Sequence, residues 1–371
     1  MCMTLLIKIK GKGAAAAERG ILNAAKIIRS GGIVIFPTET VYGIGANALD
    51  QRACSKIYKI KGRPSDNPLI VHVSSMRMAD AVGIIPPRYR AALLKVWPAP
   101  LTVIVRARKG LNRVVRGGLD TVAIRMPDNQ IALRLIEQSK VPIAAPSANI
   151  SMKPSSTTAE HAIKYFNGKV DAIISSSPSE FGIESTVLDL RNFSILRPGA
   201  YTPERIRQKF GRKPTLHIQR SAAKRPPSPG MKYRHYSPEK PLFLFEGSMG
   251  KLPSIADAAG NNLTFIGSAK SCAVMKGHCA DMICLGNSSR QKEIAHNLFA
   301  ALIELDSRRS GFGVIECFRE NGMGIAIMNR IRKACSGRSF STASGLLSIM
   351  RSMPSKNNVP RRKASGALSK K

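Results

Sequence analysis

A basic loop that runs directly into a buried strand is the feature that most constrains this chain. Lys59, Lys61 and Arg63 lie within five residues of one another, and an apolar run follows at 69–73. The run is rich in Val and Ile and is bounded by Pro and Ser, which is typical of a short buried strand. Gly62 interrupts regular structure, so we expect the cations to lie on a loop at a sheet edge. Such a loop can hold phosphate or carboxylate oxygens, although a solvated basic turn is the commoner explanation of this stretch taken alone.

Further short apolar runs alternate with segments of helical spacing and predict a mixed α/β domain over residues 1–215. The strands are predicted at 33–36, 101–105, 121–125, 171–175 and 185–190. The helices are predicted at 14–30, 50–61, 128–139 and 158–166. The hydrophobic content of 43% is ordinary and is sufficient for a sizeable core.

Composition divides the rest of the chain into three parts. Residues 205–240 carry eleven Lys or Arg, one acid and several prolines, so we predict a linker at 216–240. Strand and helix patterns resume over 241–336 and predict a compact α/β unit with mostly parallel pairing. Residues 337–371 hold eight Lys or Arg, no acid and many serines, and are predicted to be a disordered basic tail.

The charge and the cysteine pattern limit the functional class. The formal net charge of +35 predicts attraction to polyanions such as RNA, nucleotides or an anionic membrane surface. The seven cysteines include no C-x-x-C pair, which indicates a reducing compartment and no zinc site. A membrane-spanning helix needs an apolar run of about 18 residues, and no run in this sequence is that long. A soluble, cytoplasmic protein is therefore expected, without a membrane partner.

Two polar segments follow predicted strands and are candidates for holding a small ligand. The segment 37–45 is dense in hydroxyls and glycines, and Ser147 and Asn149 come directly after an apolar run at 141–146. Each segment is also compatible with an ordinary turn. His72, in its strand, is more often a core or surface residue than a ligand. Only the joint occurrence of these features with the basic loop favours a binding site.

The order of the motifs resembles the YrdC-like family. The strings that carry the resemblance are PTETVYGIG, KGRPSDNPLIVHV, WPAPLT, DTVAIRMP, VPIAAPSAN, GIESTVLDL and LRPG. The linker string SPGMKYRHYSP and the later GIAIMNRIRKA resemble the long, two-domain members, which are L-threonylcarbamoyladenylate synthases. The resemblance covers roughly residues 20–336. It implies a YrdC-like twisted open-sheet domain with a positive cavity, followed by the linker and a small Rossmann-like domain.

The resemblance also implies a reaction, a nucleotidyl transfer. L-threonine, bicarbonate and ATP give threonylcarbamoyl-AMP and pyrophosphate, and a downstream transferase complex uses the product to modify tRNA. Mg²⁺ would arrive with ATP, because no acidic cluster indicates a metal site in the protein. Two alternatives stay open: a double-stranded RNA or tRNA binding protein without catalysis, and a carbamoyl-transfer enzyme.

Site residues follow from the same resemblance. The nucleotide contacts it implies are Lys61, Arg63, Ser65, Thr121, Ser147, Asn149, Ser155, Arg197 and Tyr236. The threonine contacts it implies are Thr38, His72, Arg125, Ala145 and Ser185. Lys61 and Arg63 would neutralise charge on the α-phosphate and the leaving pyrophosphate, and are the predicted catalytic residues. Tyr236 would belong to a linker that closes over the nucleotide as a lid.

Three positions depart from the family pattern. Ser175-Ser176-Ser177 stands where the family usually has two glycines, Ala99 replaces a usual Gly, and Met152 lies where a Gly is common. Each departure is expected to shift a loop near the cavity.

Overall fold

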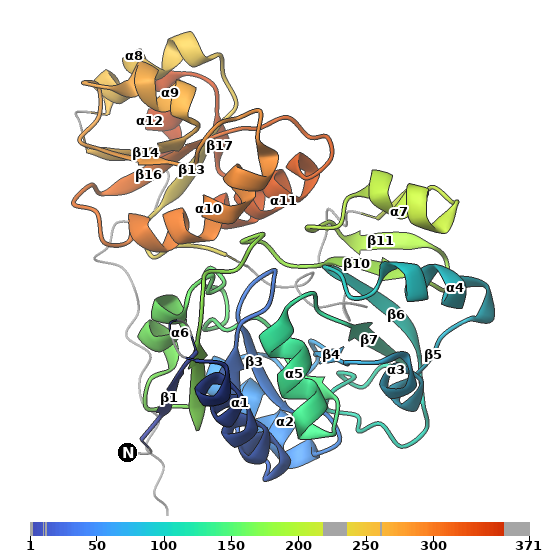
Figure 1. The fold of residues 1–371 in the computed structure, drawn as a ribbon. Helices are drawn as coiled ribbons and strands as arrows, with labels where there is room; N and C mark the ends of the chain where they lie inside the picture. The colour runs from blue at the N-terminus through green and yellow to red at the C-terminus, as the bar shows by residue number, and fades with distance from the viewer. Residues whose placement is uncertain (1–2, 10, 12, 218–235, 260–261, 352–371) are drawn as a thin grey trace, which may run out of the picture.

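The computed structural model describes residues 3–9, 11, 13–217, 236–259 and 262–351. Within this part, two α/β domains are stacked one above the other (Figure 1). The first domain is built on one extended mixed sheet, and the second on a smaller parallel sheet. The fold class predicted from the sequence is therefore confirmed. No helix in the described residues is long and apolar enough to cross a membrane.

The sheet of the first domain has twelve strands among the described residues. They are β1 (Leu5–Lys8), β2 (Val34–Phe36), β3 (Gly43–Asn47), β4 (Ile70–His72), β5 (Gly83–Ile84), β6 (Leu101–Ala107), β7 (Thr121–Arg125), β8 (Ile143–Ala144), β9 (Ala172–Ser175), β10 (Thr186–Asp189), β11 (Ser194–Arg197) and β12 (Thr215–Leu216). Their order is β1-β9-β2-β3-β8-β4-β7-β6-β10-β11-β12, with β5 beside β6. Neighbours pair parallel at β4–β7 and antiparallel at β3–β8 and β6–β7, so the sheet is mixed.

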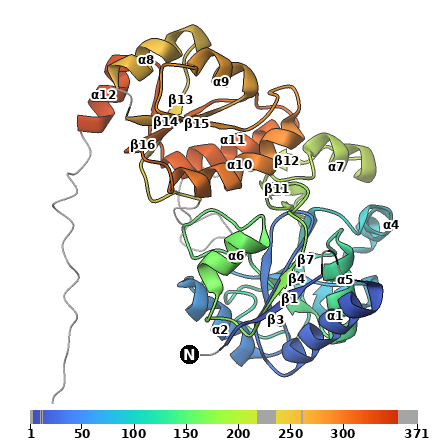
Figure 2. The same ribbon diagram turned by 60° about the vertical axis from the view of Figure 1, so that its left-hand side comes forward.

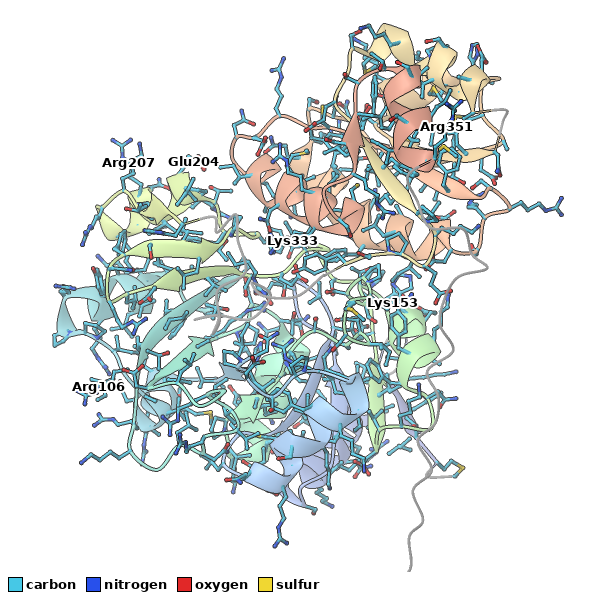
Figure 3. The ribbon with its side chains drawn as sticks, turned by 180° about the vertical axis from the view of Figure 1, so that it is seen from behind. Arg106, Lys153, Glu204, Arg207, Lys333 and Arg351 are labelled. Carbon is cyan, nitrogen blue, oxygen red and sulfur yellow. The ribbon has the colours of Figure 1, made fainter. Side chains whose placement is uncertain are left out.

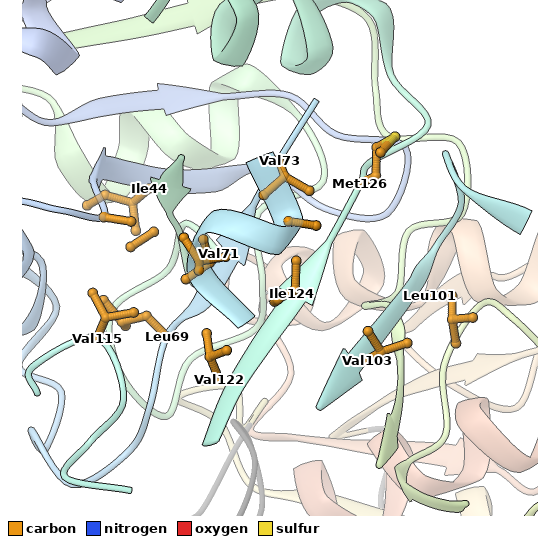
Figure 4. Packing of buried hydrophobic residues seen from close by; sticks show 14 of the residues in the cluster. Ile44, Leu69, Val71, Val73, Leu101, Val103, Val115, Val122, Ile124 and Met126 are labelled. Atoms are coloured by element: carbon orange, nitrogen blue, oxygen red, sulfur yellow. The ribbon is translucent and has the colours of Figure 1, made fainter. Parts of the chain in front are cut away.

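Helices cover this sheet and bury its apolar side chains. They are α1 (Ala14–Arg29), α2 (Gln51–Lys61), α3 (Met76–Val82), α4 (Pro87–Val96), α5 (Gln130–Ser139), α6 (Ala159–Phe166) and α7 (Pro203–Phe210). Figure 4 shows the central core, where Val71 of β4, Ile124 of β7 and Val103 of β6 lie close together. All three side chains are buried, as expected for strands covered on both faces.

Helix α2 places the basic loop at the sheet. Asp50 caps its first turn by accepting hydrogen bonds from the N–H groups of Arg52 and Ala53, at 2.8 and 3.0 Å. Gly62 ends it with a φ of 60°, a left-handed conformation that glycine adopts without steric cost. Lys61 therefore occupies the last helical position, and the chain turns sharply after it toward β4.

The second domain has five described strands, all paired in parallel. They are β13 (Leu242–Phe245), β14 (Leu263–Gly267), β15 (Asp281–Cys284), β16 (Phe312–Glu316) and β17 (Ser339–Phe340), in the order β15-β14-β16-β13-β17. The helices are α8 (Leu252–Ala258), α9 (Ala269–Met275), α10 (Gln291–Leu305), α11 (Gly324–Cys335) and α12 (Ala343–Arg351), with a short 3₁₀ turn at Met249–Lys251. Helices α10 and α11 lie between this sheet and the first domain (Figures 1 and 2).

The linker and the tail differ in how far the structure describes them. Most of the linker and lid predicted at 216–240 lies outside the described residues, so the lid stays a prediction. The tail predicted as disordered from residue 337 is wrong over its first part, because residues 339–351 form β17 and α12. β17 pairs with β13, and Leu346 packs into the core of the second domain. The basic, Ser-rich composition concealed this short apolar face. Residues 352–371 lie outside the described part.

The core position of Leu346 gives a test of this correction. Leu346 is 1% exposed. Leu346→Ala should therefore lower the unfolding free energy of the second domain by about 2–5 kcal/mol, measured by urea unfolding. Ser348→Ala, at an exposed position of the same helix, is the matched control and should change it by less than about 0.5 kcal/mol. Equal unfolding free energies of the two variants would instead support the original prediction of a disordered tail.

Candidate functional site

One cavity of the first domain lies where the basic loop meets the ends of the central strands. It encloses about 1090 Å³ of empty space, open solvent at its mouth included. The predicted site residues that line it are Thr38, Lys61, Arg63, His72, Arg125, Ala145, Ser147, Asn149, Ser185, Arg197 and Tyr236. Segments that are far apart in the sequence thus meet at one place.

Three predicted nucleotide contacts do not line this cavity. Ser65 is exposed on the basic loop. Thr121 is buried and is the first residue of β7, whereas Arg125 is the last. Ser155 is buried behind the wall, where its hydroxyl donates to Glu184 Oε1 at 2.8 Å. The roles assigned to these three residues stay predictions.

Lys61 is a buried cation held by backbone carbonyls. Its Nζ donates to the carbonyl oxygen of Ser147 at 2.6 Å and to that of Asn149. Burial and, to a smaller extent, the neighbouring Arg63 hold the pKa of Lys61 well below its ordinary value. An anion entering the cavity would offset both effects and favour the charged ammonium.

Arg63 and Arg197 bring two guanidinium groups to the same wall. Arg63 Nε donates to the carbonyl oxygen of Asn67 at 3.2 Å, and Arg197 Nη2 donates to that of Ser185 at 2.9 Å. Burial lowers the pKa of Arg63 to about 10, and burial also lowers the pKa of Arg197. Both groups are held by neutral oxygens, so their positive charge is available to a phosphate or carboxylate.

Arg125 at the end of β7 forms a buried ion pair with Glu39. Its Nη2 lies 2.6 Å from Glu39 Oε2, and the two side chains are 4% and 2% exposed. Arg125 Nε is buried and has no hydrogen-bond partner among the described residues. His72 lies beside it, and burial, together with Arg125, lowers the pKa of His72 to about 3. His72 is therefore neutral at physiological pH.

Short turns hold the hydroxyl groups of the site. Thr38 Oγ1 donates to the carbonyl oxygen of Val41 at 2.6 Å, and Ser147 Oγ donates to Asn149 Oδ1 at 2.6 Å. Asn149 Nδ2 donates to the carbonyl oxygens of Ile150 and Lys153, both at 2.8 Å. The bonds of Ser147 and Asn149 hold the loop after β8 in place before any ligand is bound. Binding without reorganisation requires such a preformed loop.

The comparisons with known proteins agree with this arrangement. Residues 26–199 match a family described as telomere recombination, and residues 201–336 match the C-terminal domain of threonylcarbamoyl-AMP synthase. The threonylcarbamoyl-AMP synthase of Pyrococcus abyssi is 41% identical over 91% of this chain and 99% of its own length. That of Bacillus subtilis is 40% identical over 86% and 93%, respectively. The crystal structure of P. abyssi Sua5 complexed with L-threonine has a TM-score of 0.84 and 39% identity, and covers 91% of this chain and 100% of that one.

The chain belongs to the two-domain threonylcarbamoyl-AMP synthase family. The family resemblance seen in the sequence is thereby confirmed over both domains. Its relatives are synthases of the nucleotidyltransferase type, which confirms the enzyme class predicted from the sequence.

The structure shows the surroundings of the three positions that depart from the family pattern. Tyr42 Oη donates to the carbonyl oxygen of Ser176 at 3.2 Å, so the serine loop is tied to the cavity wall. Ala99 is buried, and its N–H donates to Met126 O at 3.0 Å. Met152 has a φ of 74° at the cavity rim, a conformation that favours glycine and explains why glycine suits this position.

Two carboxylates and one arginine at or behind the cavity wall were not predicted from the sequence. Glu39 and Glu184 line the wall or lie behind it, and each pairs with a buried arginine. Glu184 pairs with Arg330, which comes from the second domain. Both Glu184 and Arg330 lie within motifs already recognised in the sequence, but no sequence pattern indicates that a residue at 184 meets one at 330.

The described residues do not fit a metal held by the protein. No group of three or more His, Cys, Asp or Glu side chains in the described part could hold an ion. The two acids of the cavity region are each engaged by an arginine, so neither offers a carboxylate free for a cation.

The buried pair Arg125–Glu39 gives a prediction about stability. Arg125→Met leaves the Glu39 carboxylate buried without a counter-charge, which should cost about 3–5 kcal/mol of unfolding free energy. The double variant Arg125→Met, Glu39→Gln should recover much of this loss in urea unfolding. Arg134→Met is the control, because Arg134 pairs with Glu18 at the surface at 2.8 Å and should cost at most about 1 kcal/mol. Similar losses for Arg125→Met and Arg134→Met would contradict the account.

Proposed function

We propose that this cavity converts L-threonine, bicarbonate and ATP into threonylcarbamoyl-AMP and pyrophosphate. The observation that carries the proposal is the gathering of Lys61, Arg63, Arg125 and Arg197 around one cavity in a member of this family. All three substrates are anionic at some stage, so a cationic and partly dry site would hold them together.

Threonine would lie at the Arg125 side of the cavity. Arg125 lines the cavity and its Nε has no partner among the described residues, and a guanidinium can bind a substrate carboxylate. Thr38, His72, Ser185 and the backbone at Ala145 surround the same region and would contact the amine and the hydroxyl. That P. abyssi Sua5 was crystallised with L-threonine supports this choice of substrate.

ATP would lie at the opposite side, over the basic loop. Lys61 and Arg63 would face the α-phosphate and the leaving pyrophosphate, with Arg197, Ser147 and Asn149 as further contacts. Tyr236, which belongs to the linker predicted at 216–240 and is buried in the cavity wall, would close the nucleotide side. Ser65, Thr121 and Ser155 would take part only through rearrangement, since they lie outside the cavity.

The reaction needs no covalent intermediate on the protein. The threonine amine attacks bicarbonate with loss of water, or CO2 with loss of a proton, to give the carbamate; the carbamate oxygen then attacks the α-phosphorus of ATP, and the bond to the leaving pyrophosphate breaks. Positioning of the reactants would lower the entropic part of the barrier. Lys61 and Arg63 would stabilise the charge that develops on the phosphate oxygens. Mg²⁺ would enter as part of the ATP complex, held by the phosphates.

The basic loop gives the most direct test. Lys61→Ala and Arg63→Ala should each lower pyrophosphate release by at least about 100-fold, because one cation on the developing charge is lost. The assay is pyrophosphate and adenylate formation from ATP, labelled bicarbonate and threonine. Lys59→Ala is the matched control, because Lys59 is exposed on the same helix. Unchanged pyrophosphate release by Lys61→Ala or Arg63→Ala, in protein that melts like wild type, would refute the assignment.

We further propose that the product passes to a cytoplasmic transferase complex and that the chain contacts tRNA. Exposed cations support the tRNA contact, for example Arg205, Arg207 and Lys209 on α7. Figure 3 shows Arg207 on this helix and Arg106 on the same domain, both projecting outward. The alternatives of RNA binding without catalysis and of carbamoyl transfer are less favoured, because synthases of this family match the chain over both domains.

The basic tail should add a salt-dependent part of the tRNA affinity. Truncation after Arg351 keeps α12 and removes six of the cations. The slope of log affinity against log salt should therefore fall by up to about 4–5, in filter binding with tRNA. Adenylate synthesis should be unchanged. An unaltered slope would show that the tail does not contact tRNA.

A further inference from the structure

Arg330 is a fully buried cation of the second domain that lies behind the cavity wall, against Glu184. It lies on α11 and is 0% exposed. Its Nε donates to Glu184 Oε2 at 3.0 Å, and its Nη1 donates to the carbonyl oxygen of Pro198. Glu184 and Pro198 both belong to the first domain, so this side chain bridges the two domains at the cavity.

Glu184 connects this bridge to the nucleotide side of the cavity. Its Oε1 accepts a hydrogen bond from Ser155, and its other oxygen meets Arg330. Burial raises the pKa of Glu184, but the charges of Arg330 and Arg197 outweigh burial and lower it. The carboxylate is therefore ionised, and an arginine of each domain contributes to the lowering of its pKa.

The backbone beside Glu184 leaves little room for this geometry to relax. The N–H of Ala200 donates to the carbonyl oxygen of Glu184 at 3.1 Å. A Cβ added at Gly199 would lie 2.4 Å from the same oxygen, so the two segments are in direct contact. The backbone of Glu184 is thus held at the cavity wall, which Arg197 also lines.

The two domains are also joined by contacts other than those of Arg330. Phe299 of α10 packs on the Tyr236 ring with centroids 5.0 Å apart, and Lys292 pairs with Glu180 at 2.5 Å. Apolar packing of this kind can join two domains without burying a charge. Replacing a buried ion pair by apolar groups is often neutral or stabilising, so a buried pair at a binding wall is weak evidence for a purely structural role.

We propose that Arg330 is a positioning residue of the second domain, which neutralises Glu184 and so keeps Arg197 available to the phosphates of ATP. The inference rests on the proposed function of the cavity. Without Arg330, the Glu184 carboxylate would pair with Arg197 and reduce the positive charge facing the nucleotide. This gives the second domain a direct part in nucleotide binding.

The test is a double-variant cycle with Arg330→Met and Glu184→Gln in the full-length protein. Arg330→Met should raise the KM for ATP at least about 10-fold, with the KM for threonine changed less than about twofold. The double variant should recover most of the ATP affinity, because no unpaired buried charge remains. Lys292→Met, which removes an exposed interdomain pair, should leave both constants unchanged.

Three outcomes would overturn the inference. The first is a wild-type KM for ATP in Arg330→Met, and the second is equal loss for both substrates. The third is a double variant no better than Arg330→Met, which would leave only an interdomain support. If Arg330→Met does not fold, the double variant is compared with Glu184→Gln alone. An Arg330 side chain that acts only through Glu184 should give these two proteins the same KM for ATP. A different KM for ATP would overturn the inference. Failure of the wild-type protein to release pyrophosphate would refute the proposed function instead.

Discussion

The placement of buried charge is the constraint on which the rest of this structure depends. Lys61, Arg125, Arg197 and Arg330 are all at most 6% exposed and lie at or near one cavity. Removing cations from water costs several kcal/mol each unless other groups compensate. Here, backbone carbonyls compensate Lys61 and Arg197, and two buried carboxylates compensate the other arginines. Each of these four side chains is thus engaged by oxygen atoms of the protein.

The mixed sheet and the second domain together supply the groups that compensate these cations. The parallel pair β4–β7 brings His72 opposite Arg125, and the antiparallel pairs at β8 bring Ala144 beside β3 and β4. The loop after β8 can then supply carbonyls to Lys61. The second domain closes the remaining side, where α10 and α11 pack against Tyr236 and the segment around Glu184.

Surface cations outside ion pairs differ from those of the cavity in that solvent, and not the protein, compensates their charge. Cations such as Arg205, Arg207 and Lys209 of α7 are exposed, where water and salt screen them, and they therefore affect partners more than the fold. Composition alone predicted a disordered tail from residue 337 because cations and serines dominate the count. Three apolar residues, Phe340, Leu346 and Ile349, nevertheless pack against the second sheet. A few well-placed apolar side chains were sufficient to order a segment that average composition assigned to solvent.

The sequence by itself indicated the α/β fold class, the family and eleven of the residues that line the cavity. Periodicity and capping are local, so α2, β4 and β7 could be placed from neighbouring residues alone, and the motif order carried the candidate site. Only the tertiary structure decided which residues compensate the buried cations. Glu39 with Arg125 and Glu184 with Arg330 are separated by 86 and 146 positions. Such pairs depend on how the strands and the two domains come together, and no local pattern in a single sequence encodes that distance.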